Sequence, residues 1–165
     1  MPATPDELFA FLDRLGIAHQ TVTHPALFTV EQSRALRGQI PGGHTKNLFL
    51  KDKKGALFLV SALEDALIDL KSLHNRLGAA RFSFGSADML RDTLGVEPGA
   101  VTPFGAINDK DRRVRIVLDA AMMTHPTLNY HPLVNTMTTS IARDDFLQFL
   151  AATGHPPGIL PVSGA

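Results

Sequence analysis

The sequence predicts an α+β fold in one compact domain that spans residues 1–165. This length suits a single hydrophobic core and is too short for two ordinary domains. Apolar residues recur with helical spacing in some segments and alternate like strands in others, without regular β-α-β alternation. No linker or internal repeat divides these segments. The composition, 44% hydrophobic and 19% charged, is typical of a soluble globular protein.

A strong helix start opens the chain. Thr4 suits the N-cap, Pro5 suits the first helical position, and Glu7 completes a capping box. Apolar residues at helical spacing follow, and Gly16 ends the helix. Alternation then predicts a strand over Ile17–His24.

The middle of the chain combines a hairpin with short helices. Capping residues, glycines and apolar alternation predict these elements: a helix from Thr29 to Leu36, a glycine-rich loop over residues 37–43, a hairpin of His44–Lys51 and Ala56–Leu63, and helices over Leu70–Leu77 and Ala87–Leu94. Asp52-Lys53-Lys54-Gly55 forms the hairpin turn. Ser86 is a good N-cap for the last of these helices.

The C-terminal part begins with a second Gly/Pro-rich loop over Val96–Gly105. Apolar and β-branched runs then predict strands over Val114–Leu118, Thr127–His131 and Thr136–Ile141, and a helix over Asp144–Ala152. We expect the Pro/Gly-rich tail, residues 155–165, to be irregular.

Several kinds of chemistry are excluded or disfavoured by composition and spacing. The absence of cysteine excludes disulfides and thiolate nucleophiles. No His-x-x-x-His pair and no nucleotide-binding loop is present, so we expect neither a metal nor a cofactor. A triad of Ser140, His131 and Asp144 lacks the Gly-x-Ser-x-Gly turn that exposes a serine nucleophile, so chance explains it better.

The charge balance limits the partners. Sixteen basic residues match sixteen acidic ones, which argues against a general nucleic-acid coat protein and gives no reason to expect DNA binding. A local basic face stays open, as do solvated turn tips, for the cations in or beside predicted turns: Lys51, Lys53, Lys54, Lys110, Arg112 and Arg113. The N-terminus has no signal-peptide pattern and no apolar run has membrane-spanning length, so we expect a cytoplasmic protein without a membrane partner.

Three polar islands interrupt the apolar segments and indicate a small polar site. They are Thr45-Lys46-Asn47, the segment 102–109 that includes Pro103, Phe104, Gly105, Ala106 and Asn108, and the segment 131–140 that includes His131 and Asn135. A lysine that enters a buried strand behind a glycine loop is held near a cleft, and glycine lets backbone N–H groups approach a ligand. Each island also has a structural interpretation: a strand-edge lysine, a connecting turn, and threonines in an ordinary strand.

At these islands the sequence resembles the trans-acting prolyl-tRNA editing domains, the free-standing alanyl-tRNA(Pro) deacylases among the synthetase-associated editing domains. Four stretches carry the resemblance, in the family's order: KNLFL at Lys46–Leu50, LGAARFSF at Leu77–Phe84, LGVEPGAVTPFGAIND at Leu94–Asp109, and HPLVNTMTTSI at His131–Ile141. The resemblance implies a mixed, barrel-like β-sheet flanked by helices. It also implies hydrolysis of the ester between a mischarged amino acid and the acceptor end of tRNA(Pro).

The resemblance further implies the roles of individual residues. The family's essential lysine corresponds to Lys46, which we take as the catalytic residue, and its pocket-lining histidine corresponds to His131. The expected substrate contacts are Thr45, Asn47, Pro103, Phe104, Gly105, Ala106, Asn108, His131 and Asn135. Alanine is the expected amino acid and prolyl-tRNA synthetase a candidate partner. Deacylases for cysteine, serine or another tRNA, and a non-enzymatic binding module for nucleic acid or a protein, remain alternatives.

The expected reaction uses water, because the chain offers no credible covalent nucleophile. Lys46 then has three open roles: holding the phosphate or ribose, stabilising the oxyanion, or acting as a base. We favour positioning and electrostatics. A pocket that accepts alanine and excludes proline by size would have walls from Phe104, Ala106, His131 and Met137.

Overall fold

The computed structural model describes residues 1–26 and 40–164, so the helix predicted from Thr29 to Leu36 lies outside the described residues. The α-helices are α1 (Pro5–Arg14), α3 (Leu70–Arg76), α4 (Ala87–Thr93) and α5 (Arg143–Ala152). The strands are β1 (His19–Thr23), β2 (Gly43–Asp52), β3 (Leu57–Leu63), β4 (Phe82–Phe84), β5 (Val114–Asp119), β6 (Thr127–Tyr130), β7 (Met137–Ala142) and β8 (Gly158–Leu160). The α+β prediction is confirmed.

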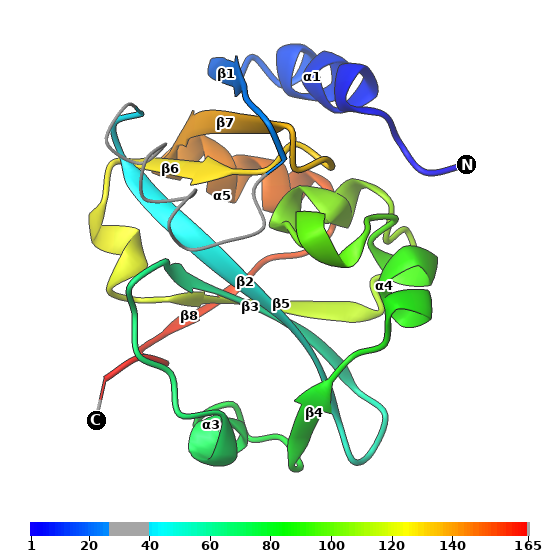
Figure 1. The fold of residues 1–165 in the computed structure, drawn as a ribbon, viewed down its shortest axis with the longest axis vertical. Helices are drawn as coiled ribbons and strands as arrows, with labels where there is room; N and C mark the ends of the chain where they lie inside the picture. Colours follow the sequence, from blue (N-terminus) through cyan, green and yellow to red (C-terminus); the bar gives the residue numbers. More distant parts are fainter. Residues whose placement is uncertain (27–39, 165) are drawn as a thin grey trace.

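The strands form one mixed sheet in the order β1-β7-β6-β2-β3-β5-β8, with β4 paired to β2. The pairs β2–β6, β3–β5 and β5–β8 are parallel and the others antiparallel. Figure 1 shows the long strand β2 running between the layer of β1, β7 and β6 and the layer of β3, β5 and β8. The order ends at β1 and β8, so the sheet does not close into the barrel that the resemblance implied.

The first helix, α1, begins at the capping residues from which it was predicted. The Thr4 side chain accepts a hydrogen bond from the Glu7 backbone, and the Glu7 side chain accepts one from the Thr4 backbone. Such a cap is worth about 1 kcal/mol. Gly16 has a φ of +73°, a left-handed conformation that ends the helix at low cost.

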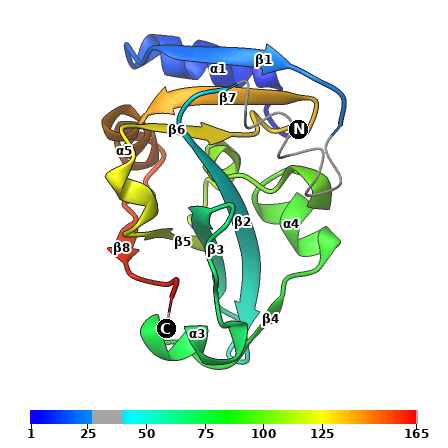
Figure 2. The same ribbon diagram turned by 60° about the vertical axis from the view of Figure 1, so that its left-hand side comes forward.

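Two apolar clusters lie on opposite faces of β2, β3 and β5. The larger joins α1, α5 and the loop before β5, and includes Leu8, Phe104 and Phe149, which are fully buried. The smaller lies under α3 and the C-terminal segment, with Phe58, Val60 and Val162 among its members. Figure 2 shows α3 and the chain end beside β3 and β5, at the far end of the molecule from α1. β3 is therefore buried on both faces, which explains its continuous apolar sequence.

The prediction that residues 155–165 form an irregular tail was wrong. β8 pairs in parallel with β5, and Val162 is buried in the smaller cluster. The carboxylate of Asp119 accepts hydrogen bonds from the Val162 backbone and from the Ser163 hydroxyl. Proline and glycine suggested a loop, but a partner strand some 40 residues earlier, which local composition does not reveal, orders this segment.

Two smaller features of the fold were not predicted from the sequence. The three-residue strand β4 pairs with the end of β2, and the second Gly/Pro-rich loop contains short 3-10 turns at Pro98–Ala100 and Pro103–Ile107. In the described part of the chain, no helix has both the length and the apolarity needed to cross a bilayer.

Candidate functional site

The layer of β1, β7, β6 and the start of β2 has one apolar and one polar face. Register places Gln20 beside Ser140, Ser140 beside Asn129, and Asn129 beside His44. Because side chains alternate along a strand, residues two positions further on share that face. We call this the polar face; its residues are Gln20, Val22, His24, His44, Lys46, Asn129, His131, Thr138 and Ser140.

A cavity of about 710 Å³ opens on the polar face. Its walls come from β1, β7, the start of β6 and the segment before β2: Gln20, Val22, Ile40, Pro41, Gly42, Pro126, Thr127 and Ser140. Asn129 borders it and fixes its shape. Its side-chain amide donates to the carbonyls of Pro41 and Gly43, and it accepts a hydrogen bond from the Ser140 hydroxyl.

His131 presents one unshared ring nitrogen to this face. Its Nδ1 lies 2.9 Å from the Met137 carbonyl oxygen, an acceptor, so Nδ1 carries the proton and donates. Burial lowers the pKa of His131 from its ordinary value of 6.5; the bond to Met137 opposes this, and nearby His24 lowers the pKa further. The neutral form is favoured, which leaves Nε2 as a hydrogen-bond acceptor.

His24 adds a second imidazole beside His131. The two ring centroids lie 6.2 Å apart. His24 Nδ1 faces the Pro25 carbonyl at 2.8 Å, and its Nε2 lies 2.8 Å from the Thr138 hydroxyl. With Nδ1 donating, Nε2 of neutral His24 accepts from Thr138, so this ring is held in place by both nitrogens.

Lys46 lies where the polar face meets the smaller apolar cluster. The last parallel pair between β2 and β6 is His44 with Asn129. Lys46 lies two residues beyond this pair on β2, and His131 lies two residues beyond it, just past the end of β6. The Lys46 ammonium donates to the Ala66 carbonyl in the segment that follows β3. The next apolar residue on this side of β2, Leu48, packs against the smaller cluster.

The neighbours of Lys46 point to the opposite face of β2. The Thr45 hydroxyl donates to the Asn129 carbonyl at 2.7 Å, and the Asn47 amide donates to the Val101 carbonyl at 3.3 Å. The side-chain oxygen of Asn47 is buried and has no hydrogen-bond partner among the described residues. A buried acceptor without a partner is costly, so this atom is a plausible contact for a donor on a ligand.

The predicted Gly/Pro loop lies on the same side as Asn47, against the larger cluster. Pro103 begins a 3-10 turn whose N-cap is Thr102. The ring of Phe104 is fully buried and makes edge contacts with Tyr130, Phe146 and Phe149. A side chain at Gly105 would approach Leu94 to within 2.8 Å. These contacts show that the loop packs the core.

The remaining predicted contacts are dispersed. Ala106 is buried in the larger cluster. Asn108 links two segments, accepting from the Ala3 backbone and donating to the Leu94 carbonyl. Asn135 lies in the turn between β6 and β7. The structure therefore gathers Lys46 and His131 on the polar face and places Thr45, Asn47 and the loop behind it; a substrate role for the second group stays a prediction.

The sequence analysis missed His24 and Asn129 as members of the site. Alternation along the strands could have indicated them, because both lie at alternate positions that share a face with predicted site residues. The register that brings the strands together, however, depends on residues distant in the sequence. Ser140, placed in a chance triad, donates to Asn129 instead. Among residues 1–26 and 40–164, no three His, Asp or Glu side chains are grouped so that they could hold a metal ion.

Fold and site together define a single-domain α+β protein with a polar binding face built on a mixed sheet. The model of the aminoacyl-tRNA editing domain matches residues 24–149. The chain belongs to this family, and the resemblance seen in the four sequence stretches is confirmed.

Relatives agree with this assignment. The chain is 40% identical over 156 residues to a prolyl-tRNA synthetase associated domain-containing protein 1 of Danio rerio, covering 93% of this chain and 85% of that protein. It is 34% identical over 149 residues to the prolyl-tRNA editing protein ProX of Acetoanaerobium sticklandii, covering 90% and 91%. A crystal structure of a candidate trans-editing enzyme for prolyl-tRNA synthetase superposes with a TM-score of 0.72 at 15% identity, covering all of both chains, which shows a shared fold.

Proposed function

We propose that this protein hydrolyses the ester of mischarged aminoacyl-tRNA, with alanyl-tRNA(Pro) as its substrate. Membership of the editing-domain family supports the reaction class. The observation that carries the proposal is the placement of an ammonium and a neutral imidazole on one face. Lys46 and His131 each lie two residues beyond the last pair that joins β2 to β6. An ester placed between them meets a positive charge on one side and a proton acceptor on the other.

Each of the two residues has a separate task in this reaction. Water attacks the ester carbonyl, and His131 Nε2 accepts the hydrogen bond that orients the water or the ribose hydroxyl beside it. The acyl C–O bond then breaks, the ribose oxygen leaves as a hydroxyl with the proton that the water gives up, and the free amino acid is released. The Lys46 ammonium, which gives up its bond to the Ala66 carbonyl, stabilises the developing oxyanion. The Asn47 amide nitrogen, which donates to the Val101 carbonyl behind β2, holds the adjacent loop rather than the ester.

Selection of alanine requires exclusion by size. Prolyl-tRNA synthetase cannot reject the smaller alanine well, because a missing methylene costs only about 1–3 kcal/mol of discrimination. A second site that admits alanine and clashes with proline completes the selection. His131 and Met137 are the walls that we propose, because the Met137 carbonyl holds the His131 ring in one orientation.

The acceptor end of the tRNA needs cations near this site. A hollow of about 310 Å³ lies at the tip of the β2–β3 hairpin, further along β2 from Lys46, and three cations, Lys51, Lys53 and Arg81, line it together with Asp52. This favours a local basic face over solvated turn tips for the two lysines. We further propose a cytoplasmic location and an encounter with prolyl-tRNA synthetase, in keeping with the reaction.

Turnover separates this proposal from its alternatives. The protein is incubated with labelled alanyl-, seryl-, cysteinyl- and prolyl-tRNA(Pro), and with alanyl-tRNA of another specificity. Multiple turnovers on alanyl-tRNA(Pro), with prolyl-tRNA(Pro) spared, are the expected result. Faster release of serine or cysteine than of alanine would make that amino acid the substrate. Tight binding without release of any amino acid would indicate a binding module.

A further inference from the structure

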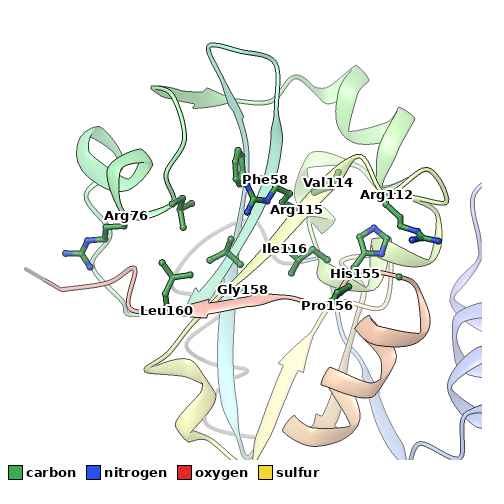
Figure 3. A pocket seen from close by; sticks show the side chains of 13 residues that line it. Phe58, Arg76, Arg112, Val114, Arg115, Ile116, His155, Pro156, Gly158 and Leu160 are labelled. Atoms are coloured by element: carbon green, nitrogen blue, oxygen red, sulfur yellow. The ribbon is translucent and has the colours of Figure 1, made fainter.

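A second basic region lies outside the polar face, along the edge of β5 and the segment after α5. A hollow of about 280 Å³ there has apolar walls and three arginines in its lining, Arg76, Arg112 and Arg115. Figure 3 shows Arg115 beside Phe58 in the middle of the hollow, Arg112 beside His155 at one end and Arg76 at the other. Among the described lining residues there is no carboxylate.

Packing holds Arg115 in place without neutralising it. Its guanidinium lies over the ring of Phe58, 5.4 Å from the centroid, and no described carboxylate pairs with it. An aromatic ring beneath a guanidinium orients its flat face and leaves its N–H donors directed outward. Arg115 is thus a fixed cation with unused hydrogen-bonding capacity.

Backbone geometry places Arg112. Its φ is +54°, a left-handed conformation that is uncommon for a residue with a side chain. Gly154, itself at φ +81°, lies against it, and a side chain there would approach the Arg112 guanidinium to within 2.8 Å. Glycine therefore makes the room in which this guanidinium lies. No described acidic side chain lies within ion-pair distance of Arg112.

A buried polar contact joins the two segments that carry these residues. His155 Nε2 and Asp109 Oδ2 lie 2.9 Å apart, and both side chains are 2% exposed. The same carboxylate accepts from the backbone of Arg113 and Val114 at the start of β5. The segment before β5 and the segment after α5 therefore form one rigid rim on which Arg112 stands.

The basic region continues beyond the first hollow. A neighbouring hollow of about 420 Å³ shares Arg112 and Gly154 with it and adds Lys110; no described carboxylate lines this hollow either. Arg115, Arg112 and Lys110 thus follow one another along a continuous depression, which we call the basic groove. A succession of fixed cations suits a polyanion with repeated charges, whereas a single small anion would need only one of them.

We propose that the basic groove binds the sugar-phosphate backbone of the substrate tRNA, apart from the site that holds the ester. The proposal rests on the proposed function for the identity of the RNA. Guanidinium groups bind phosphate oxygens in pairs and contribute affinity without reading sequence. The groove supplies binding energy for the body of the tRNA, while the polar face receives the aminoacyl end.

The test measures binding of uncharged tRNA(Pro), which needs no deacylation, by the wild type and by the double variant Arg112→Asn/Arg115→Gln. Asparagine tolerates the left-handed backbone at position 112. We expect about tenfold weaker binding near 0.1 M salt and a log–log salt slope smaller by about 1.5–2 units, since each neutralised phosphate contributes about 0.7–0.9. At saturating alanyl-tRNA(Pro), kcat stays within about twofold of the wild type.

Matched variants separate the groove from general effects of charge. Arg91 on α4 bonds Glu97 and Asp88 and lines neither hollow of the basic groove, so Arg91→Gln removes one guanidinium outside the groove. It should leave binding unchanged, and Arg112→Lys/Arg115→Lys should restore most of the salt slope. Thermal melting of each variant checks the fold.

Three outcomes overturn the proposal: an unchanged tRNA affinity and slope in the double variant, an equal loss in Arg91→Gln, or a groove that binds inorganic phosphate or AMP while tRNA binding is unaffected. Failure of the deacylation assay together with a weakened tRNA affinity in the double variant would contradict the proposed function and support the groove.

Discussion

Two groups of buried polar residues in this protein differ in how far their hydrogen bonds are satisfied. Asp52, Asp109 and Asp119 each bind at least two donors, at least one of them from a segment distant in the sequence, and their oxygens hold turns and chain ends in place. Within residues 1–26 and 40–164, His131 on the polar face keeps an unshared nitrogen, and behind it the oxygen of Asn47 has no partner. Burial of a polar group is common to both regions, and unused hydrogen-bonding capacity distinguishes the one that we assign to a ligand.

The largest effect is expected at Lys46. Lys46→Ala should leave the fold intact and lower kcat/KM for alanyl-tRNA(Pro) by at least about 100-fold, the scale for losing a strong electrostatic contact in the transition state. Steady-state deacylation together with circular dichroism measures both. Near-normal turnover by a folded Lys46→Ala protein would remove this lysine from the mechanism.

A smaller but more specific effect is expected at His131. His131→Ala removes a wall, so prolyl-tRNA(Pro) should be cleaved about 10- to 100-fold faster relative to alanyl-tRNA(Pro) than by the wild type. Cleavage of both substrates by both proteins gives the ratio. If the variant loses activity on the two substrates equally, His131 acts in catalysis alone and another residue excludes proline.

The contrast between the regions is sharpest at Asp119. Asp119→Ala leaves the Val162 N–H and the Ser163 hydroxyl without their acceptor and should lower the free energy of unfolding by about 2–3 kcal/mol. The kcat/KM of the protein that stays folded should be unchanged. Urea unfolding and deacylation at low temperature measure the two quantities. A loss of activity without a loss of stability would show that Asp119 acts in the reaction and is not only structural.

The pH dependence of activity reports on His131. Because its pKa is lowered, the neutral imidazole persists as the pH falls to 6.5, and kcat/KM should decline only below that value. Proton uptake by His131 also favours the unfolded chain, whose histidine keeps the ordinary pKa, so stability falls in the same direction. An acid limb above pH 6.5 in the wild type, or one that is unchanged in His131→Asn, would contradict this role.

The smallest effect concerns Asp52 and acid stability. Burial would raise the pKa of Asp52, but hydrogen bonds from the backbone of Ala56, Ala80 and Lys54 outweigh it and lower the pKa below 3.8. The folded state therefore binds this proton less readily than the unfolded state. Its stabilising contribution is complete above the ordinary value and disappears as the pH falls through the lowered one. Asp52→Asn should lower the melting temperature most near pH 7 and flatten its decline in acid, which melting curves of both proteins across this pH range measure. An equal shift at every pH would contradict this assignment.

The sequence predicted those parts of the fold that short-range interactions determine. The capping box at Thr4 and the β2–β3 hairpin were found because their signals lie within a few residues. β8 was missed because its stabilising partner, β5, is distant, and β4 because three residues carry no period. The polar islands were found, but strand alternation sends Lys46 and Asn47 to opposite faces, and only the pairing of β2 with β6 shows which residues share a face.

The pairing of β2 with β6 has a further consequence for the width of the site. Only two register pairs join these strands, whereas seven join β2 to β3. The pairing of β2 with β6 therefore ends at His44, two residues before Lys46, and the distance from Lys46 to His131 depends on a ladder of few bonds, each worth about 1 kcal/mol net. The separation of Lys46 and His131 can therefore adjust to a substrate while the hairpin that carries Lys46 keeps all of its own pairs.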